Sequence, residues 1–164
     1  MKTARALPAA LAVVFLSTAA NADDVGFGRR LFYNTAQCTY CHGWAGDGAG
    51  EPQSSGSAAN LRESPLTREQ LVEVISCGIP GKAMPRFDEA AYAEKRCYGG
   101  VTEQAVGQYL PPLPAGAVLG PREVNAVVDF LQARIIGRGP ITRSECEGVF
   151  GESARSCKQY PEQP

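Results

Sequence analysis

Residues 38–42 read Cys-Thr-Tyr-Cys-His, which places two thiols and an imidazole within one short stretch. Two cysteines three positions apart lie on nearly one face of a helical turn, so both sulfurs can reach the two vinyl groups of one haem. The histidine that follows places a ring nitrogen under the iron. We therefore predict that Cys38, Cys41 and His42 hold one covalently attached haem c.

Three other uses of a Cys-x-x-Cys pair fit the rest of the sequence less well. A thioredoxin-like redox pair needs a preceding strand in an α/β chain, and no such alternation is visible. A zinc site needs a second ligand pair, but the other four cysteines show no Cys-x-x-Cys spacing. A disulfide between Cys38 and Cys41 would be awkward in a helical turn and would leave His42 without a role.

The sixth ligand of the iron can be argued by elimination. His42 is the only histidine, so two histidines of one molecule cannot bind the iron. Apart from Met1, Met84 is the only methionine, and it lies in the Gly/Pro-bounded stretch 81–85, where a loop is expected. We predict His42 and Met84 as the metal ligands, with Lys82 replacing Met84 when its ammonium loses a proton at alkaline pH.

The elements around these residues are expected to be helical. The capping-box pair Thr67 and Gln70 and a proline at 121 mark two helix starts, whereas 43–65 is rich in Gly, Ser and Pro and reads as a loop. No strand pattern is evident, so the predicted class is all-α, one helical domain wrapped around the haem. The predicted helices cover residues 25–36, 67–77, 89–96, 102–109 and 121–136, with a short one after Thr142.

These features resemble a class I c-type cytochrome of the monohaem, bacterial periplasmic kind. The resemblance covers about 26–87, and more loosely 121–136. It implies a cytochrome c-like fold, His/Met ligation of one haem, and electron transfer rather than enzymatic activity. The motifs that carry it are Cys38 to His42, Gly43, Gly46-Asp47-Gly48 and Met84-Pro85-Arg86-Phe87.

The resemblance also implies how the helices meet and what contacts the haem. A first helix carrying Gly28 and Phe32 should cross a C-terminal helix carrying Phe130. Leu61 should pack on the haem face, although the proline often found beside it in the family is missing. Trp44 and Arg62 are candidates to hydrogen-bond the haem propionates. Together with the motif residues, the predicted cofactor-binding set is Cys38, Cys41, His42, Met84, Leu61, Trp44 and Arg62.

Residues 1–22 have the features of a secretory signal peptide. Lys2 and Arg5 precede a short apolar run, and Ala20-Asn21-Ala22 offers small residues for cleavage. The apolar run is roughly half of the ~20 residues that a membrane helix needs, so cleavage is expected rather than an uncleaved anchor. The mature chain is then located in the periplasm.

The mature chain is expected to be a single domain over 23–164. Two parts exceed a minimal cytochrome c: an extended segment, 88–120, and a C-terminal extension, 137–164. The extended segment follows the Met84 loop, where it could shape the docking face for a partner or be surface decoration.

Four cysteines remain after haem attachment, and an oxidising compartment favours their pairing. Three connectivities are possible, and sequence proximity favours Cys77 with Cys97 and Cys146 with Cys157. The first disulfide would enclose Met84, contribute about 3 kcal/mol on the chain-entropy model and keep the methionine near the iron.

The balance of basic and acidic residues limits the kinds of partner that the chain could bind. Without Lys2 and Arg5 the 16 basic residues fall to 14, against 17 acidic ones, which argues against nucleic acid. Only three lysines remain, so a basic patch would be built mainly from arginine. The expected role is a monomeric electron carrier, without membrane insertion, between a periplasmic dehydrogenase (such as a quinoprotein alcohol dehydrogenase) and an oxidase or another cytochrome. The alternatives are a haem-based redox or gas sensor and a haem subunit of an oxidoreductase complex.

Overall fold

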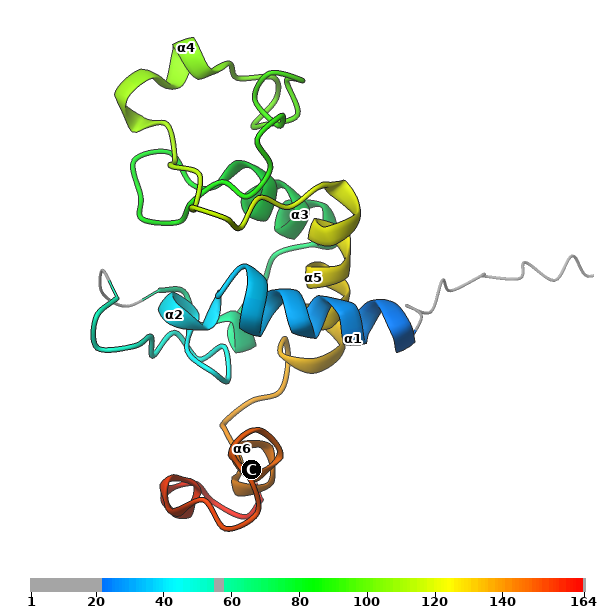
Figure 1. Cartoon of the computed structure of the whole chain (residues 1–164), viewed down its shortest axis with the longest axis vertical. Coiled ribbons are helices and arrows are strands. Elements are labelled where there is room, and N and C mark those ends of the chain that lie inside the picture. Colours follow the sequence, from blue (N-terminus) through cyan, green and yellow to red (C-terminus); the bar gives the residue numbers. More distant parts are fainter. Residues whose placement is uncertain (1–21, 55–57, 164) are drawn as a thin grey trace, which may run out of the picture.

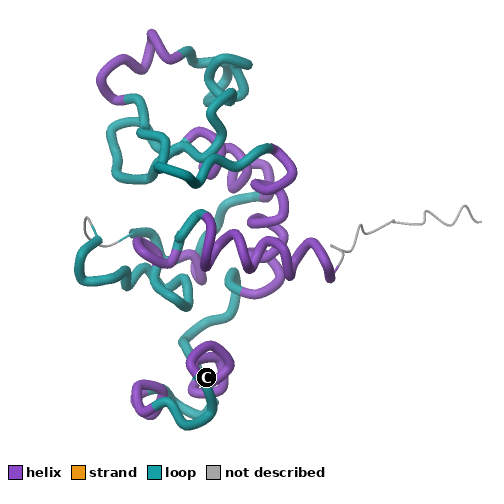
Figure 2. The backbone as a smooth tube through the Cα atoms, in the orientation of Figure 1, coloured by secondary structure: helices purple, strands orange, loops and turns teal. Residues whose placement is uncertain are grey.

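The computed structural model describes residues 22–54 and 58–163, and within these ranges helices are joined by irregular loops (Figures 1 and 2). No strand occurs in these ranges, which confirms the all-α prediction. None of the helices described has the length and apolar character needed to cross a membrane. The expected signal peptide lies outside the described residues except for Ala22, and it stays a prediction.

Helix α1 (Ala22–Arg30) leads the chain into the Cys-x-x-Cys-His motif. It continues as a π-helical turn, Leu31–Thr35, a form that is rare and often found beside functional sites. Gln37 then adopts a left-handed φ of 49°, and the Cys38 N–H donates to the Phe32 carbonyl at 2.9 Å. The helix predicted over 25–36 is confirmed, and its end places Cys38 beside the core.

Helix α5 (Pro121–Arg134) crosses α1 near the centre of the molecule (Figure 1). The two backbones come so close that a Cβ built on Gly28 would lie 1.8 Å from the Ala126 carbonyl oxygen. Beside this contact the centroids of the Phe32 and Phe130 rings lie 5.4 Å apart. The expected crossing through Gly28, Phe32 and Phe130 is confirmed.

Helix α3 (Arg68–Cys77) begins with the predicted capping box. The Thr67 hydroxyl accepts a hydrogen bond from the Gln70 N–H, and the Gln70 side chain accepts one from the Thr67 N–H. The helix packs on α5, where Arg68 and Asp129 form an ion pair with a nitrogen–oxygen distance of 2.5 Å. The apolar faces of α1, α3 and α5 together form the main core. Its largest buried members include Leu31, Phe32, Leu71, Ile75, Phe87, Val124, Val128, Phe130 and Leu131.

The extended segment 88–120 forms a second lobe above α3 in Figure 1. It contains α4 (Glu103–Val106) and a 3₁₀ turn, Gly107–Tyr109, where a helix over 102–109 was predicted. The lobe has a small core of its own, which the Cys77–Cys97 disulfide ties to the end of α3. The predicted pairing of these two cysteines is confirmed.

The helix predicted over 89–96 is wrong, because this stretch is a series of turns. The Asp88 carboxylate accepts a hydrogen bond from the Ala90 N–H at 3.0 Å and pairs with Arg96 at 2.8 Å. Lys95 then takes a left-handed φ of 55°. Side-chain hydrogen bonds of this kind compete with the helical ladder, and here they turn the chain back toward Cys77.

The C-terminal extension forms a third lobe, at the bottom of Figure 1. Helix α6 (Arg143–Phe150) begins with the capping box of Thr142 and Glu145, which confirms the helix predicted there. A 3₁₀ turn, Arg155–Gln159, follows, and the predicted disulfide between Cys146 and Cys157 is confirmed.

A methyl group at Gly28 should force α1 and α5 apart, since the atoms it would meet are backbone atoms of α5. We expect Gly28→Ala to lower the free energy of unfolding by about 2 kcal/mol or more in urea titrations of the holoprotein. The matched control is Gly148→Ala in α6, whose Cβ would meet nothing within 4 Å. That variant should be neutral or slightly stabilising, as helix propensity predicts. Equal stability of the two variants would contradict the close crossing.

Candidate haem-attachment site

The Cys-x-x-Cys-His motif occupies one helical turn, α2 (Thr39–His42). Cys38 caps this turn, and its carbonyl accepts the His42 N–H at 2.9 Å. Cys38 and Cys41 are therefore one turn apart on the helix, both half-buried and both free thiols. Two sulfurs placed in this way can both bond to one flat ligand.

The His42 imidazole is oriented by a hydrogen bond between its Nδ1 and the Ala59 carbonyl, at 3.0 Å. Because a carbonyl only accepts, this contact places a proton on Nδ1, so Nε2 of the neutral ring is the nitrogen left to bind a metal. Burial lowers the pKa of His42, an effect that the hydrogen bond to Ala59 partly opposes. The ring is thus held in the form that binds a metal. Ala59 could not be predicted from the sequence, because every residue type has a backbone carbonyl.

The loop after His42 folds back beneath the motif. The Gly48 N–H donates to the His42 carbonyl at 2.9 Å, and the Leu61 N–H donates to the Gly46 carbonyl at 2.7 Å. Gly43 adopts a φ of 78°, and a Cβ there would lie 2.4 Å from the Asp47 carboxylate. Leu61, which opens a 3₁₀ turn (Leu61–Glu63), is thereby half-buried against the main core. Its contact with the haem stays a prediction.

Met84 lies in a closed loop between α3 and the second lobe. The Ile79 N–H donates to the Met84 carbonyl at 3.2 Å, and the Gly81 N–H donates to the Tyr109 carbonyl at 3.0 Å. The Met84 side chain is half-buried and packs against the main core. The Cys77–Cys97 disulfide closes the chain around this loop, as predicted. The loop after α3 and the α2 turn extend to the same side of the molecule (Figure 1).

The geometry distinguishes among the chemistries open to the two thiols. Burial raises the pKa of Cys38 to about 12, whereas a redox-active thiol needs a lowered pKa. Within the described ranges no group of three or more His, Cys, Asp or Glu side chains could hold a metal ion on its own. Two free thiols, one neutral imidazole and one thioether form a donor set that fits a haem c, since the porphyrin itself supplies the other iron ligands.

A protein-family model described as cytochrome c oxidase, cbb3-type, subunit III matches residues 24–103. The match covers 80 of the 164 residues and supports a c-type cytochrome family. Its cofactor is haem c, bound covalently and containing iron, and its chemistry is haem-based electron transfer. Comparisons with curated proteins and with solved structures found no match. The matched range contains all seven predicted cofactor-binding residues and ends within the second lobe.

The Arg62 guanidinium of this cytochrome is buried and bound to the C-terminal extension. Its Nε donates to the Gly139 carbonyl at 2.5 Å, and Nη2 pairs with Glu145 at 3.0 Å. A further nitrogen, Nη1, donates to the Ala45 carbonyl at 3.3 Å. These contacts span up to 83 positions of the sequence and had no signal in it. Arg62 therefore holds the extension to the haem-motif loop, and its propionate contact stays a prediction.

Trp44 also contacts the C-terminal extension. Its ring meets the Phe150 and Tyr160 rings edge to face, with centroids 5.3 and 5.9 Å away. The Trp44 carbonyl accepts a hydrogen bond from the Tyr33 hydroxyl at 2.7 Å, which ties this loop to the end of α1. The ring thus packs against the third lobe, and its role toward the haem stays a prediction.

Arg86, two residues after Met84, was not singled out as a site residue. Its guanidinium pairs with Glu103 at 2.5 Å and lies 5.8 Å from the centroid of the Tyr92 ring. Its buried Nε has no hydrogen-bond partner within the described residues. Arg86 joins the Met84 loop to the second lobe, much as Arg62 joins the other loop to the third.

Removing the disulfide around Met84 should loosen the methionine from the iron. We expect Cys77→Ser/Cys97→Ser to bind added imidazole roughly tenfold more tightly in the ferric state, since the displaced form becomes more populated. Loss of the sulfur-to-iron charge-transfer band reports the displacement, and the same band should disappear at a lower pH in an alkaline titration. Cys146→Ser/Cys157→Ser is the control and should leave both titrations unchanged. Identical titrations for the two variants would show that the disulfide does not restrain Met84.

Breaking the Arg62 ion pair should destabilise the third lobe. Glu145→Ala leaves a guanidinium whose side chain is 3% exposed without its carboxylate, and it removes the α6 capping box. We expect a loss of about 2 kcal/mol and faster proteolysis within 137–164. Glu162→Ala removes the partner of Arg143 in an ion pair whose carboxylate is 78% exposed, and it should change neither measurement. Equal effects of the two substitutions would contradict the anchoring role.

Proposed function

We propose that this protein is a periplasmic monohaem electron carrier in which Cys38 and Cys41 form the thioether bonds to the haem. His42 Nε2 and the Met84 sulfur would fill the two axial positions of the iron. The observation that carries this proposal is the His42 ring, oriented by the Ala59 carbonyl and kept neutral by burial, on a turn that also presents two free thiols. The bound haem supplies a reversible one-electron couple, which Met/His ligation poises at a raised potential.

The protein's own residues support transfer rather than catalysis. With one histidine and one methionine committed to the iron, no further histidine or methionine of the mature chain is left to act on a substrate there. The half-buried Met84 is restrained by its closed loop and by the disulfide around it. A ligand set that is fixed in both oxidation states favours fast outer-sphere transfer and disfavours binding of oxygen or peroxide.

The periplasm is the location that the proposal requires. Two disulfides are formed, and such bonds persist in an oxidising compartment. The N-terminal features described above would direct the chain there, and they lie outside the described residues.

A periplasmic dehydrogenase, such as a quinoprotein alcohol dehydrogenase, is the donor we propose, with an oxidase or another cytochrome as the acceptor. The second lobe lies beside the Met84 loop, and it exposes Tyr109 by 60% while Ile79 of the loop is exposed by 39%. Exposed apolar side chains of this kind suit the weak, small interfaces of electron-transfer encounters. The alternative is a haem subunit of an oxidoreductase complex, which the description of the matched family model favours.

Carbon monoxide distinguishes a carrier from a gas sensor or a peroxidase-like enzyme. The reduced cytochrome should bind little carbon monoxide at neutral pH, because Met84 occupies the sixth position. Met84→Ala should bind it stoichiometrically, with the shift of the Soret band as the measurement. As a control, both proteins should keep their pigment in acidified acetone, since thioether bonds survive it. Tight binding by the unmodified protein would reject the carrier assignment, and a colourless precipitate would reject covalent attachment.

A further inference from the structure

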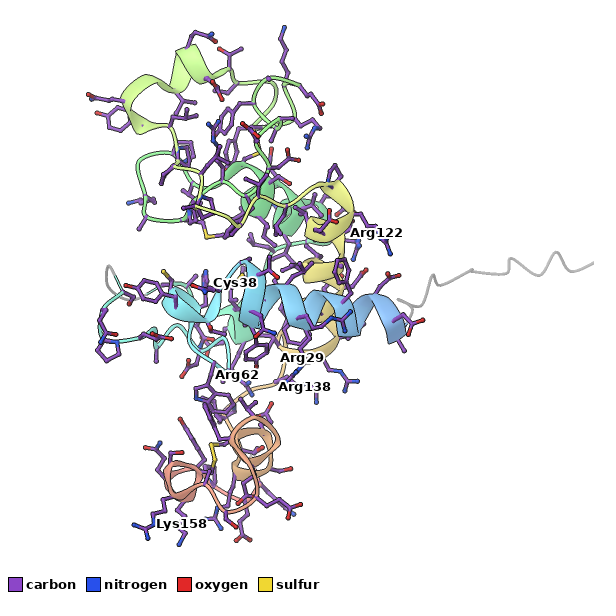
Figure 3. All side chains as sticks on the ribbon, viewed as in Figure 1. Arg29, Cys38, Arg62, Arg122, Arg138 and Lys158 are labelled. Atoms are coloured by element: carbon purple, nitrogen blue, oxygen red, sulfur yellow. A yellow bond between two sulfur atoms is a disulfide. The ribbon has the colours of Figure 1, made fainter. Side chains whose placement is uncertain are left out.

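A groove of about 760 Å³ lies between α1, α5 and the C-terminal extension. Gly26 and Tyr33 from the first helical segment line one wall, and Ser144 and Val149 of α6 line the opposite wall. Figure 3 shows Arg29, Arg62 and Arg138 around this region, between α1 and α6. The groove is separate from the α2 turn and from the Met84 loop, neither of which contributes to its lining.

The groove carries an excess of positive charge. Arg29, Arg134 and Arg138 line it, are exposed, and form no ion pair within the described ranges. Glu145 is the one carboxylate among the lining residues, and its charge is taken up by Arg62 at 3.0 Å. Three guanidiniums therefore face one concave space without a compensating acid, although the chain as a whole is slightly acidic.

The floor of the groove is apolar and aromatic. Tyr33, Trp44 and Phe130 contribute to it, and the Arg29 guanidinium already lies 4.9 Å from the Tyr33 ring centroid. Aromatic side chains beside unpaired guanidiniums can contact a flat apolar body while the charges bind its acidic groups.

The C-terminal extension is what makes this surface concave. Residues 137–163 lie outside the range matched by the family model, yet several contacts attach them to the rest of the chain. The Arg62–Glu145 pair and the packing of Phe150 on Trp44 attach α6 to the loops beside α1, and the Cys146–Cys157 disulfide joins α6 to the 3₁₀ turn of the same extension. The extension thus supplies one wall of a groove in which three arginines, Arg29, Arg134 and Arg138, have no ion-pair partner within the described residues.

We propose that this groove binds a small organic anion with two or more acidic groups on a flat apolar body. Its volume lies within the range of small-molecule sites, whereas docking of a protein uses a broader and flatter surface. Carboxylates, sulfonates and phosphate esters share the required chemistry. Trp44 and Arg62 of the predicted cofactor-binding set line the groove, but neither His42 nor Met84 does, so this proposal can fail while the electron-carrier assignment holds.

Calorimetric titration of the oxidised holoprotein tests the proposal, with naphthalene disulfonate as the probe and inorganic sulfate as the anion without an apolar body. We expect one saturable site for the disulfonate, with an affinity about tenfold above that of sulfate, that weakens as salt is added. The indole resonance of Trp44, the only tryptophan, should shift with the same saturation curve. Absence of saturable binding, equal affinity for sulfate, or an unmoved indole resonance would overturn the proposal.

Charge-removing variants locate the site. Arg29→Gln and Arg138→Gln should each weaken disulfonate binding roughly threefold, and the double variant about tenfold. The matched control is Arg122→Gln, which removes an exposed arginine at the opposite end of α5, over the Phe27 ring (Figure 3). It should leave the affinity unchanged. Urea midpoints and haem spectra of all variants establish that they are folded, and a loss of binding in Arg122→Gln as large as in the others would overturn the assignment to the groove.

Discussion

The close crossing of α1 and α5 at Gly28 is the constraint on which the rest of this cytochrome depends. A glycine at that point lets the Ala126 carbonyl approach α1, and Phe32 and Phe130 fill the space beside it. The crossing fixes the direction of α1, and α1 ends where the Cys-x-x-Cys-His turn begins. Backbone packing therefore places the turn that carries the thiols and the imidazole, and the hydrogen bond to the Ala59 carbonyl then orients the imidazole ring.

Two arginines, Arg62 buried and Arg86 half-buried, attach the parts of the chain that lie beyond this core. Arg62 binds Glu145 of the third lobe, and Arg86 binds Glu103 of the second. Each arginine lies in a loop that bears a predicted haem contact, and each lobe also has a disulfide. A charge pair with a buried member is sensitive to geometry, so it fixes the position of a lobe more than it adds stability.

Features encoded by neighbouring residues could be predicted from the residues themselves. Among contacts between distant residues, the crossing at Gly28 and Phe130 was expected only because the family resemblance implied it. Both capping boxes, the proline start of α5 and both disulfides are local patterns, and each is confirmed. The turns over 89–96 were missed because helical periodicity does not register the hydrogen bonds made by the Asp88 carboxylate. The engagement of Arg62 by the third lobe was missed because it joins residues 83 positions apart.

The burial of Cys38 affects which of the six cysteines take part in thiol–disulfide exchange. Thiol–disulfide exchange proceeds through the thiolate, and a pKa of about 12 leaves on the order of one Cys38 sulfur in 10⁵ in that form at neutral pH. The partners in the two disulfides are only 20 and 11 positions apart, so each pair closes a short loop. As a free thiol in the folded chain, Cys38 therefore exchanges slowly with the four cysteines that form the two disulfides.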